Sequence, residues 1–262
     1  MGKGFKKATV VFTALLLLLS VSCIAMTVFL FIRGPRAAIL GHRATKQPGA
    51  LSSATLGETE DYGQNYINSL IFVGDSVTFG LKDTGLLLGG KETVQIWSGE
   101  NGDLSLDYNI DKTAILYPSE GSLLSVSEAA EESKPEYMVI TVGIRNGVQY
   151  CGEESFKGYY KKLIVSIQSA SPDTKIILQS VFPVSKGFEK ENSGISAEKI
   201  KNANVWISDI ANECSVKYLD THSALQDSKG YLLSKYDSGD GLHLNAEGYR
   251  AVLNYIRTHG YK

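Results

Sequence analysis

Short apolar runs alternate with amphipathic stretches over the C-terminal three quarters of the chain. Five of these runs are rich in β-branched residues and predict strands: 70–73, 93–97, 137–142, 175–182 and 216–219. Unbroken apolar runs suit parallel strands that are buried on both faces. Stripes with helical spacing lie between or after them, from Phe156 to Ala170, from Ser196 toward Cys214, and after Asn245. This alternation predicts an α/β domain over residues 66–262, with an open parallel sheet of about five strands and functional loops at their carboxyl ends.

A different pattern precedes this domain. After a lysine-containing segment, residues 1–7, the run from Ala8 to Ile32 contains no charged residue and is long enough as a helix to cross a hydrocarbon core of about 30 Å. Because a signal-peptide core is only about 7–15 residues long, the run predicts an uncleaved transmembrane helix, residues 8–32. Residues 33–65 are rich in small and polar residues with little periodicity, which predicts a flexible linker.

Basic residues flank the apolar run on both sides. Lysines before it favour a cytoplasmic N-terminus, a single membrane pass and an extracytoplasmic C-terminal domain in the cell membrane. Basic residues after it nearly balance them: Arg33, Arg36, Arg43 and Lys46. We therefore expect the membrane as a partner, with an orientation that the charge pattern alone supports weakly.

Composition narrows the function classes. The 262 residues are 43% hydrophobic and 21% charged, enough apolar material for one globular core. A net charge of −2 gives no reason to expect a nucleic-acid partner, because phosphate binding depends on clustered Lys and Arg. Neither a CxxC pair nor a zinc-ligand spacing is present among Cys23, Cys151 and Cys214. A disulfide between Cys151 and Cys214 stays open, since the spacing does not decide it.

The strongest local signal is an apolar strand that runs directly into Gly74-Asp75-Ser76 before a predicted helix. A serine there presents its hydroxyl near a helix N-terminus, where backbone N–H groups favour developing negative charge. On its own, Ser76 is either a nucleophile or only the cap of that helix.

The second signal is a polar, glycine-rich loop before the last helix, which contains Asp240 and His243. An Asp three residues before a His can accept a hydrogen bond from imidazole Nδ1, which leaves Nε2 free to take a proton from a serine. Asp75 and Asp240, even with Glu100 and Asp103, are too few ligands for a metal-dependent phosphoesterase. We expect no metal and no cofactor.

Together the two loops resemble the SGNH/GDSL hydrolases. Gly74-Asp75-Ser76-Val77 is similar to that family's nucleophile block, and Asp240-Gly241-Leu242-His243 to its terminal Asp-x-x-His block. The resemblance covers roughly residue 66 to the C-terminus and implies a flavodoxin-like three-layer sandwich. It implies that Ser76 is the nucleophile, that His243 is the general base and then acid, and that Asp240 orients His243.

The resemblance also implies an oxyanion hole formed by the backbone N–H of Ser76, a glycine N–H and an Asn side chain. Trp97-Ser98-Gly99-Glu100-Asn101-Gly102 is similar to the second block, with Gly99 the better match and Gly102 the alternative. In the third block, usually Gly-x-Asn-Asp, strict alignment places Arg145 where Asn is usual and Asn146 where Asp is usual. We expect Asn146 to reach the oxyanion, with Arg145 as the alternative donor.

The sequence thus predicts a membrane-anchored serine esterase that deacylates an ester on an extracytoplasmic carbohydrate, such as a cell-envelope polysaccharide, through an acyl-Ser76 intermediate. The same residues would serve an acyltransferase, since any well-placed alcohol can resolve an acyl-enzyme. A third hypothesis, motivated by Arg145 in the third block, is a non-catalytic surface binding module that retains the fold.

Overall fold

The computed structural model describes residues 53–144, 146–192 and 194–262. Its centre is a five-stranded parallel sheet in the order β2-β1-β5-β6-β7. These strands are β1 (Leu70–Gly74), β2 (Ile96–Trp97), β5 (Tyr137–Thr141), β6 (Lys175–Gln179) and β7 (Lys217–Leu219). The expected open parallel sheet of about five strands is confirmed.

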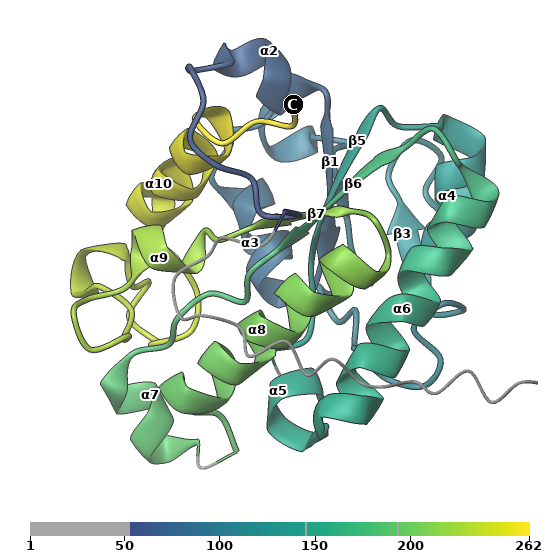
Figure 1. The fold of residues 1–262 in the computed structure, drawn as a ribbon. Coiled ribbons are helices and arrows are strands. Elements are labelled where there is room, and N and C mark those ends of the chain that lie inside the picture. Colours follow the sequence, from purple (N-terminus) through teal and green to yellow (C-terminus); the bar gives the residue numbers. More distant parts are fainter. Residues whose placement is uncertain (1–52, 145, 193) are drawn as a thin grey trace, which may run out of the picture. The chain divides into compact units, whose positions relative to one another are not determined.

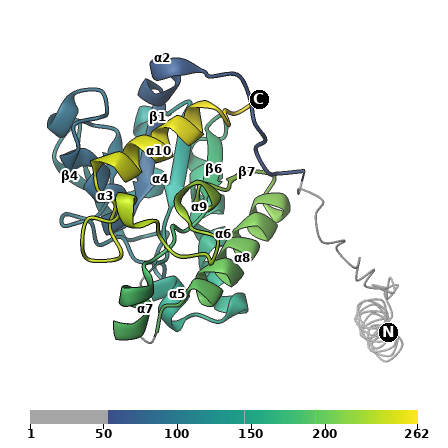
Figure 2. The same ribbon diagram turned by 90° about the vertical axis from the view of Figure 1, so that its left-hand side faces the viewer.

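Helices cover both faces of this sheet, as Figure 1 shows. On one side lie α3 (Ser76–Asp83) and α10 (Ala246–Arg257), and on the other α4 (Val126–Ser133), α6 (Glu153–Ala170) and α8 (Ala197–Glu213). The view turned by 90° looks onto the side of α3 and α10 (Figure 2). The expected α/β arrangement of a sheet between two helical layers is therefore present.

Covering both faces explains why the strand sequences are almost continuously apolar. In β5 and β6 every residue after the first is buried, and β1 has one partly exposed residue among five. The predicted helix starts also hold: the Ser196 side chain accepts from the N–H of Lys199, and the Asn245 side chain accepts from the N–H groups of Glu247 and Gly248.

The strand order determines where a site can form. The chain leaves β1 toward β2 on one side and later enters β5 on the other side of β1. Such a topological switch point opens a crevice at the carboxyl ends of the two strands. The loops after Gly74 and after Thr141 meet there, because these two residues are partners in the β1–β5 ladder.

Several shorter elements were not expected from the sequence. An antiparallel hairpin, β3 (Ala114–Tyr117) with β4 (Ser122–Ser125), precedes α4. The other α-helices in the described part of the chain are α2 (Gly63–Asn68), α5 (Asn146–Tyr150), α7 (Lys186–Glu191) and α9 (His222–Leu225). The second strand is shorter than the predicted 93–97, and its neighbour Gln95 instead donates through its side chain to the carbonyls of Ile67 and Leu70.

The folded domain begins earlier than the predicted boundary at residue 66. Ala54 and Leu56 are buried, and Thr55 forms a parallel bridge with Tyr218 of β7. Two backbone hydrogen bonds, Leu56 N–H to Tyr218 O and Tyr218 N–H to Ala54 O, fix this segment to the sheet edge. The end of the expected linker, residues 33–65, is therefore part of the domain.

The predicted cytoplasmic segment 1–7 and transmembrane helix 8–32 lie outside the described residues. Of the helices that the structure does describe, none combines the length and the apolar character needed to span a bilayer.

Gly74 offers a test of how tightly the nucleophile loop is packed. A Cβ at this position would lie 2.1 Å from Thr78 Oγ1 and 2.2 Å from the Thr141 carbonyl oxygen. Since the carbonyl belongs to the neighbouring strand, we expect Gly74→Ala to lower the free energy of unfolding by about 1–3 kcal/mol, measured by urea denaturation.

The matched control is Gly158→Ala on the exposed face of α6, where a Cβ meets nothing within 4 Å. That variant should gain about 0.5–1 kcal/mol from helix propensity. Equal unfolding free energies for the two variants would contradict the close packing at Gly74.

Candidate active site

Ser76 is the first residue of α3 and follows directly after β1 and Asp75. The helix cap is Asp75, whose Oδ1 accepts from the N–H of Val77 at 3.2 Å. Ser76 is therefore not the cap, the structural alternative that the sequence left open. Its hydroxyl lies at the positive end of the helix, where first-turn N–H groups have no partner within the helix.

The second loop, between residues 237 and 245, is held by carboxylates that accept backbone N–H groups. Asp237 Oδ1 accepts from Gly239 and Gly241 at 2.8 and 2.9 Å. Asp240 Oδ1 accepts from the N–H groups of Leu242 and His243 at 2.9 and 2.8 Å. This network fixes the direction in which Asp240 points its other oxygen.

The structure brings the three predicted residues Ser76, Asp240 and His243 into one hydrogen-bonded line. Asp240 Oδ2 lies 2.6 Å from His243 Nδ1, and His243 Nε2 lies 3.0 Å from Ser76 Oγ. Both distances are within the range needed for proton transfer. The side chains of His243 and Asp240 are 31% and 51% exposed, so the line opens to solvent.

The surroundings of Asp240 keep it ionised. Partial burial raises its pKa, but the hydrogen bonds from the His243 ring and from the N–H groups of His243 and Leu242 outweigh this and lower the pKa to about 2. A carboxylate at this position favours the tautomer with the proton on Nδ1 and leaves Nε2 able to accept from Ser76.

Hydrogen bonds outside the Asp240–His243–Ser76 line fix the position of the His243 loop relative to the helix of Ser76. The Tyr249 hydroxyl, on α10, donates to the Val77 carbonyl on α3 at 2.6 Å. The N–H of Ser185, which caps α7, donates to the Gly241 carbonyl at 2.8 Å. The loop of His243 is thereby attached both to the helix of Ser76 and to α7.

Of the two candidate glycines in the second block, Gly102 lies beside Ser76. A Cβ on Gly102 would be 3.0 Å from Ser76 Cα and 2.9 Å from Phe79 Cβ, whereas one on Gly99 would meet Asp103. Gly102 also lines a hollow with Ser76, and Gly99 is not among its lining residues. The Gly102 N–H donates to the Gly99 carbonyl at 2.9 Å, so the two glycines close one turn.

Asn146 lines the same hollow as Ser76 and Gly102. It is the first residue of α5, and the loop that leads to it begins where β5 ends beside β1. The residue is partly exposed. The alternative donor, Arg145, lies outside the described residues.

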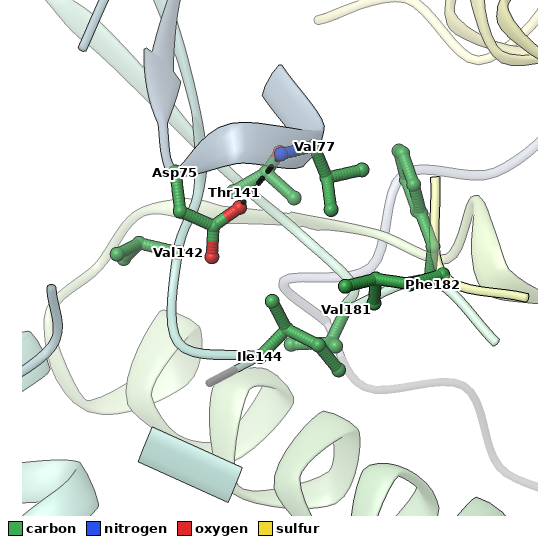
Figure 3. A pocket seen from close by; sticks show the side chains of 8 residues that line it. Asp75, Val77, Thr141, Val142, Ile144, Val181 and Phe182 are labelled. Atoms are coloured by element: carbon green, nitrogen blue, oxygen red, sulfur yellow. Dashed lines mark hydrogen bonds between the residues drawn. The ribbon is translucent and has the colours of Figure 1, made fainter. Parts of the chain in front are cut away.

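Asp75 joins the nucleophile loop to the loop of Asn146. Its carboxylate accepts from the N–H of Val77 and, through Oδ2 at 3.3 Å, from the N–H of Gly143; Ile144 contributes a third N–H. Figure 3 shows the Asp75 side chain pointing toward the segment of Val142 and Ile144.

The cavity around this carboxylate is small and mostly apolar. It has a volume of about 10 Å³, about enough for one water molecule. Besides Asp75 and Thr141, it is lined by Val77, Val142, Ile144, Val181, Phe182 and Leu242. Burial in these surroundings raises the pKa of Asp75 to about 6, although its three backbone donors and the nearby His243 lower it.

Other chemically capable residues lie apart from this line. His222 is buried at the start of α9 with Nδ1 2.9 Å from the Val181 carbonyl, and burial lowers its pKa. Cys151 and Cys214 are free thiols, each partly buried. Within the described ranges, no group of three or more His, Cys, Asp or Glu side chains has a geometry that would hold a metal ion.

Two features of the site were not settled by sequence reasoning. The glycine that approaches Ser76 is one: Gly99 was preferred and Gly102 kept as the alternative, because two glycines three residues apart satisfy the same block and only the turn between them decides which approaches the serine. The bridging by Asp75 is the other. The sequence did contain an indication of this role, since a carboxylate at the end of an otherwise apolar strand must accept hydrogen bonds from nearby donors.

Comparison with known proteins identifies the family. The model of the GDSL-like lipase/acylhydrolase family matches residues 72–251. No curated protein matches the chain significantly.

Several solved structures are similar to this chain. A GDSL-like lipase from Parabacteroides merdae is 17% identical, with 79% of this chain and 100% of that chain covered and a TM-score of 0.52. A GDSL-like lipase from Bacteroides thetaiotaomicron is 17% identical over 72% and 85% of the two chains, with a TM-score of 0.48. The periplasmic domain of a Salmonella lipopolysaccharide acetyltransferase is 17% identical over 78% and 89%, also with a TM-score of 0.48.

At 17% identity, the Parabacteroides merdae structure, whose TM-score is 0.52, speaks for the fold alone. The family match covers more than half of the chain and includes both the Gly-Asp-Ser block and the Asp-x-x-His block. The chain therefore belongs to the GDSL-like lipase/acylhydrolase family.

Proposed function

We propose that this protein is a serine esterase that cleaves a carboxylic ester through an acyl-Ser76 intermediate. The observation that carries the proposal is the line from Asp240 Oδ2 to His243 Nδ1 at 2.6 Å and from His243 Nε2 to Ser76 Oγ at 3.0 Å. Nucleophile, base and orienting carboxylate are each within hydrogen-bond reach of the next.

In this mechanism His243 Nε2 accepts the hydroxyl proton as Ser76 Oγ attacks the ester carbonyl. The imidazolium, stabilised by Asp240, then gives that proton to the departing alcohol oxygen, and the acyl group stays on Ser76. A water molecule gives its proton to His243, attacks the acyl carbonyl and releases the acid, with the proton returning to Ser76 Oγ. Asp240 stays ionised throughout.

The negative charge that develops on the carbonyl oxygen needs donors beside Ser76. We assign this role to the N–H of Ser76 at the start of α3 and to the side-chain amide of Asn146; the N–H of Gly102, which also lines the hollow, already donates to the Gly99 carbonyl. Support comes from the hollow that Ser76, Gly102 and Asn146 line together.

For the substrate we propose a small acyl group, such as acetate, on an extracytoplasmic carbohydrate. The partly exposed His243 and Asp240 support an ester whose alcohol is large and stays in solvent. The uncharged run from Ala8 to Ile32 supports anchoring in the cell membrane, with lysines before it favouring a cytoplasmic N-terminus.

Replacing Ser76 tests the mechanism directly. We expect Ser76→Ala, purified without residues 1–33, to lose hydrolysis of p-nitrophenyl acetate by more than about 10³-fold, because the nucleophile is gone. Circular dichroism should show an unchanged fold. Activity equal to that of the unmodified protein would rule out Ser76 as nucleophile.

A fluorophosphonate probe supplies the control that separates the remaining hypotheses. It should label the wild-type protein at Ser76 and leave Ser76→Ala unlabelled, and a protein that resists the probe would favour the binding module. A membrane-impermeant version, applied to intact cells, should label the membrane fraction. Labelling of the purified protein but not of intact cells would contradict only the proposed location.

Substitutions at two adjacent residues can show which one supplies the oxyanion donor of the third sequence block. We expect Asn146→Ala to lower kcat by about 10²–10³-fold, the usual effect of removing one oxyanion donor. Arg145→Ala is the matched control and should lower kcat less. A larger loss in Arg145→Ala would transfer the role to Arg145.

The carboxylate of Asp75, which lines a mostly apolar cavity, predicts a pH dependence of stability. Its pKa is about 6 in the folded protein against an ordinary value of 3.8, so the folded state binds more protons between these values. The contribution of Asp75 to the free energy of unfolding therefore falls by about 2–3 kcal/mol as pH rises from about 4 to about 6.

Asp75→Asn cannot titrate, so its unfolding free energy relative to wild type should rise across that pH window, as measured by urea denaturation at several pH values. Asp173→Asn, in the exposed turn before β6, controls for the loss of a surface charge. A pH-independent difference between Asp75→Asn and wild type would contradict the raised pKa.

A further inference from the structure

Ser76 lies between two hollows that are lined by different elements. One, of about 270 Å³, contains Gly102 and Asn146 and holds the proposed oxyanion donors. The other, of about 480 Å³, contains His243 and the outer turns of α3. The second volume falls within the range of about 300–1,000 Å³ that is typical of small-molecule sites.

The position of His243 decides which part of the ester each hollow receives. After acylation the leaving oxygen must accept its proton from His243 Nε2, so the alcohol has to depart on the side that His243 lines. The carbonyl oxygen points to the other side, toward Asn146. The hollow between α3 and His243 is therefore the alcohol side of the site, an assignment that depends on the proposed function.

The chemistry of the alcohol side comes mainly from Phe79 and Asp83. Phe79 is partly exposed and offers an apolar surface on which the C–H face of a sugar ring can lie. Asp83 is exposed and offers a carboxylate that accepts hydrogen bonds from hydroxyl groups. The Thr84 hydroxyl also lies here, but it already donates to the Leu81 carbonyl and accepts from the N–H of Leu86.

The charged residue that lines the hollow on the alcohol side is acidic. Among the described residues that line the hollow there is no Lys or Arg, and Asp83 adds a negative charge to that of nearby Asp240. Asp83 is also the last residue of α3, where the helix dipole disfavours an acidic side chain. A carboxylate there works against helix stability, which argues for another use.

We propose that Asp83 and Phe79 form a subsite for the alcohol part of the ester that accepts a neutral sugar and rejects an alcohol bearing phosphate. Phe79 contributes binding to the ring, and Asp83 contributes hydrogen bonds to its hydroxyl groups together with repulsion of anions. Both act as specificity determinants and neither takes part in the proton transfers.

The test compares two acetyl esters that differ by one phosphate group: 3-O-acetylglucose and 3-O-acetylglucose 6-phosphate. The measured quantity is the ratio of kcat/KM for the phosphorylated ester to that for the neutral one. Asp83→Lys should raise this ratio by about tenfold or more at low ionic strength, and the effect should shrink as salt is added. Asp83→Asn should raise it less.

Asp173→Lys is the matched charge control, because Asp173 is exposed in the turn before β6. This turn lies at the amino ends of the strands, whereas the site lies at their carboxyl ends. Its ratio should equal that of wild type. Asp83→Lys is expected to fold, since a cation at the end of α3 suits the helix dipole. A ratio in Asp83→Lys no different from that in Asp173→Lys would overturn the charge selection.

Phe79 is tested by Phe79→Leu, which keeps an apolar side chain but removes the ring. KM for 3-O-acetylglucose should rise severalfold while kcat changes little, and an unchanged KM would overturn the ring contact. Failure of the proposed function looks different: wild type would then show no Ser76-dependent cleavage of either ester.

Discussion

One buried hydrogen bond, from the Tyr249 hydroxyl to the Val77 carbonyl, joins the two halves of the site. Ser76 and His243 are far apart in the sequence and belong to elements that do not pair in the sheet. Their geometry depends on how α10 packs beside α3, and this bond sets the register of the two helices close to the serine. The loop of His243 leads directly into α10, so a shift of this helix relative to α3 would change the distance from His243 Nε2 to Ser76 Oγ.

The sheet was predictable because short apolar, β-branched runs such as 137–142 favour strands in a covered sheet. The line of three residues was predictable because two sequence blocks together resemble a family, and a Gly-Asp-Ser block after a strand sets Ser76 at a carboxyl end. The position of Gly102 was not predictable, since spacing cannot tell which glycine of a turn approaches a serine. The start of the domain escaped prediction too, because the backbone hydrogen bonds that attach Ala54 and Leu56 to Tyr218 leave no pattern in the sequence.

Asp75 illustrates a compromise between stability and positioning. Its carboxylate is held by three backbone donors and so ties the loop of Ser76 to the loop that leads to Asn146. The apolar cavity in Figure 3 makes the charged form of the same group costly, which is why its pKa is raised. A neutral side chain would avoid this cost but could not accept from all three donors equally well.

The attachment of residues 54–56 to β7 has a consequence for how the protein behaves among copies of itself. An outer strand of a sheet normally offers unpaired N–H and C=O groups to any extended chain that meets it. Here the bridge between Thr55 and Tyr218 occupies part of that outer strand. The segment that leads into the domain thus also shields this strand from edge-to-edge aggregation with other copies of the chain.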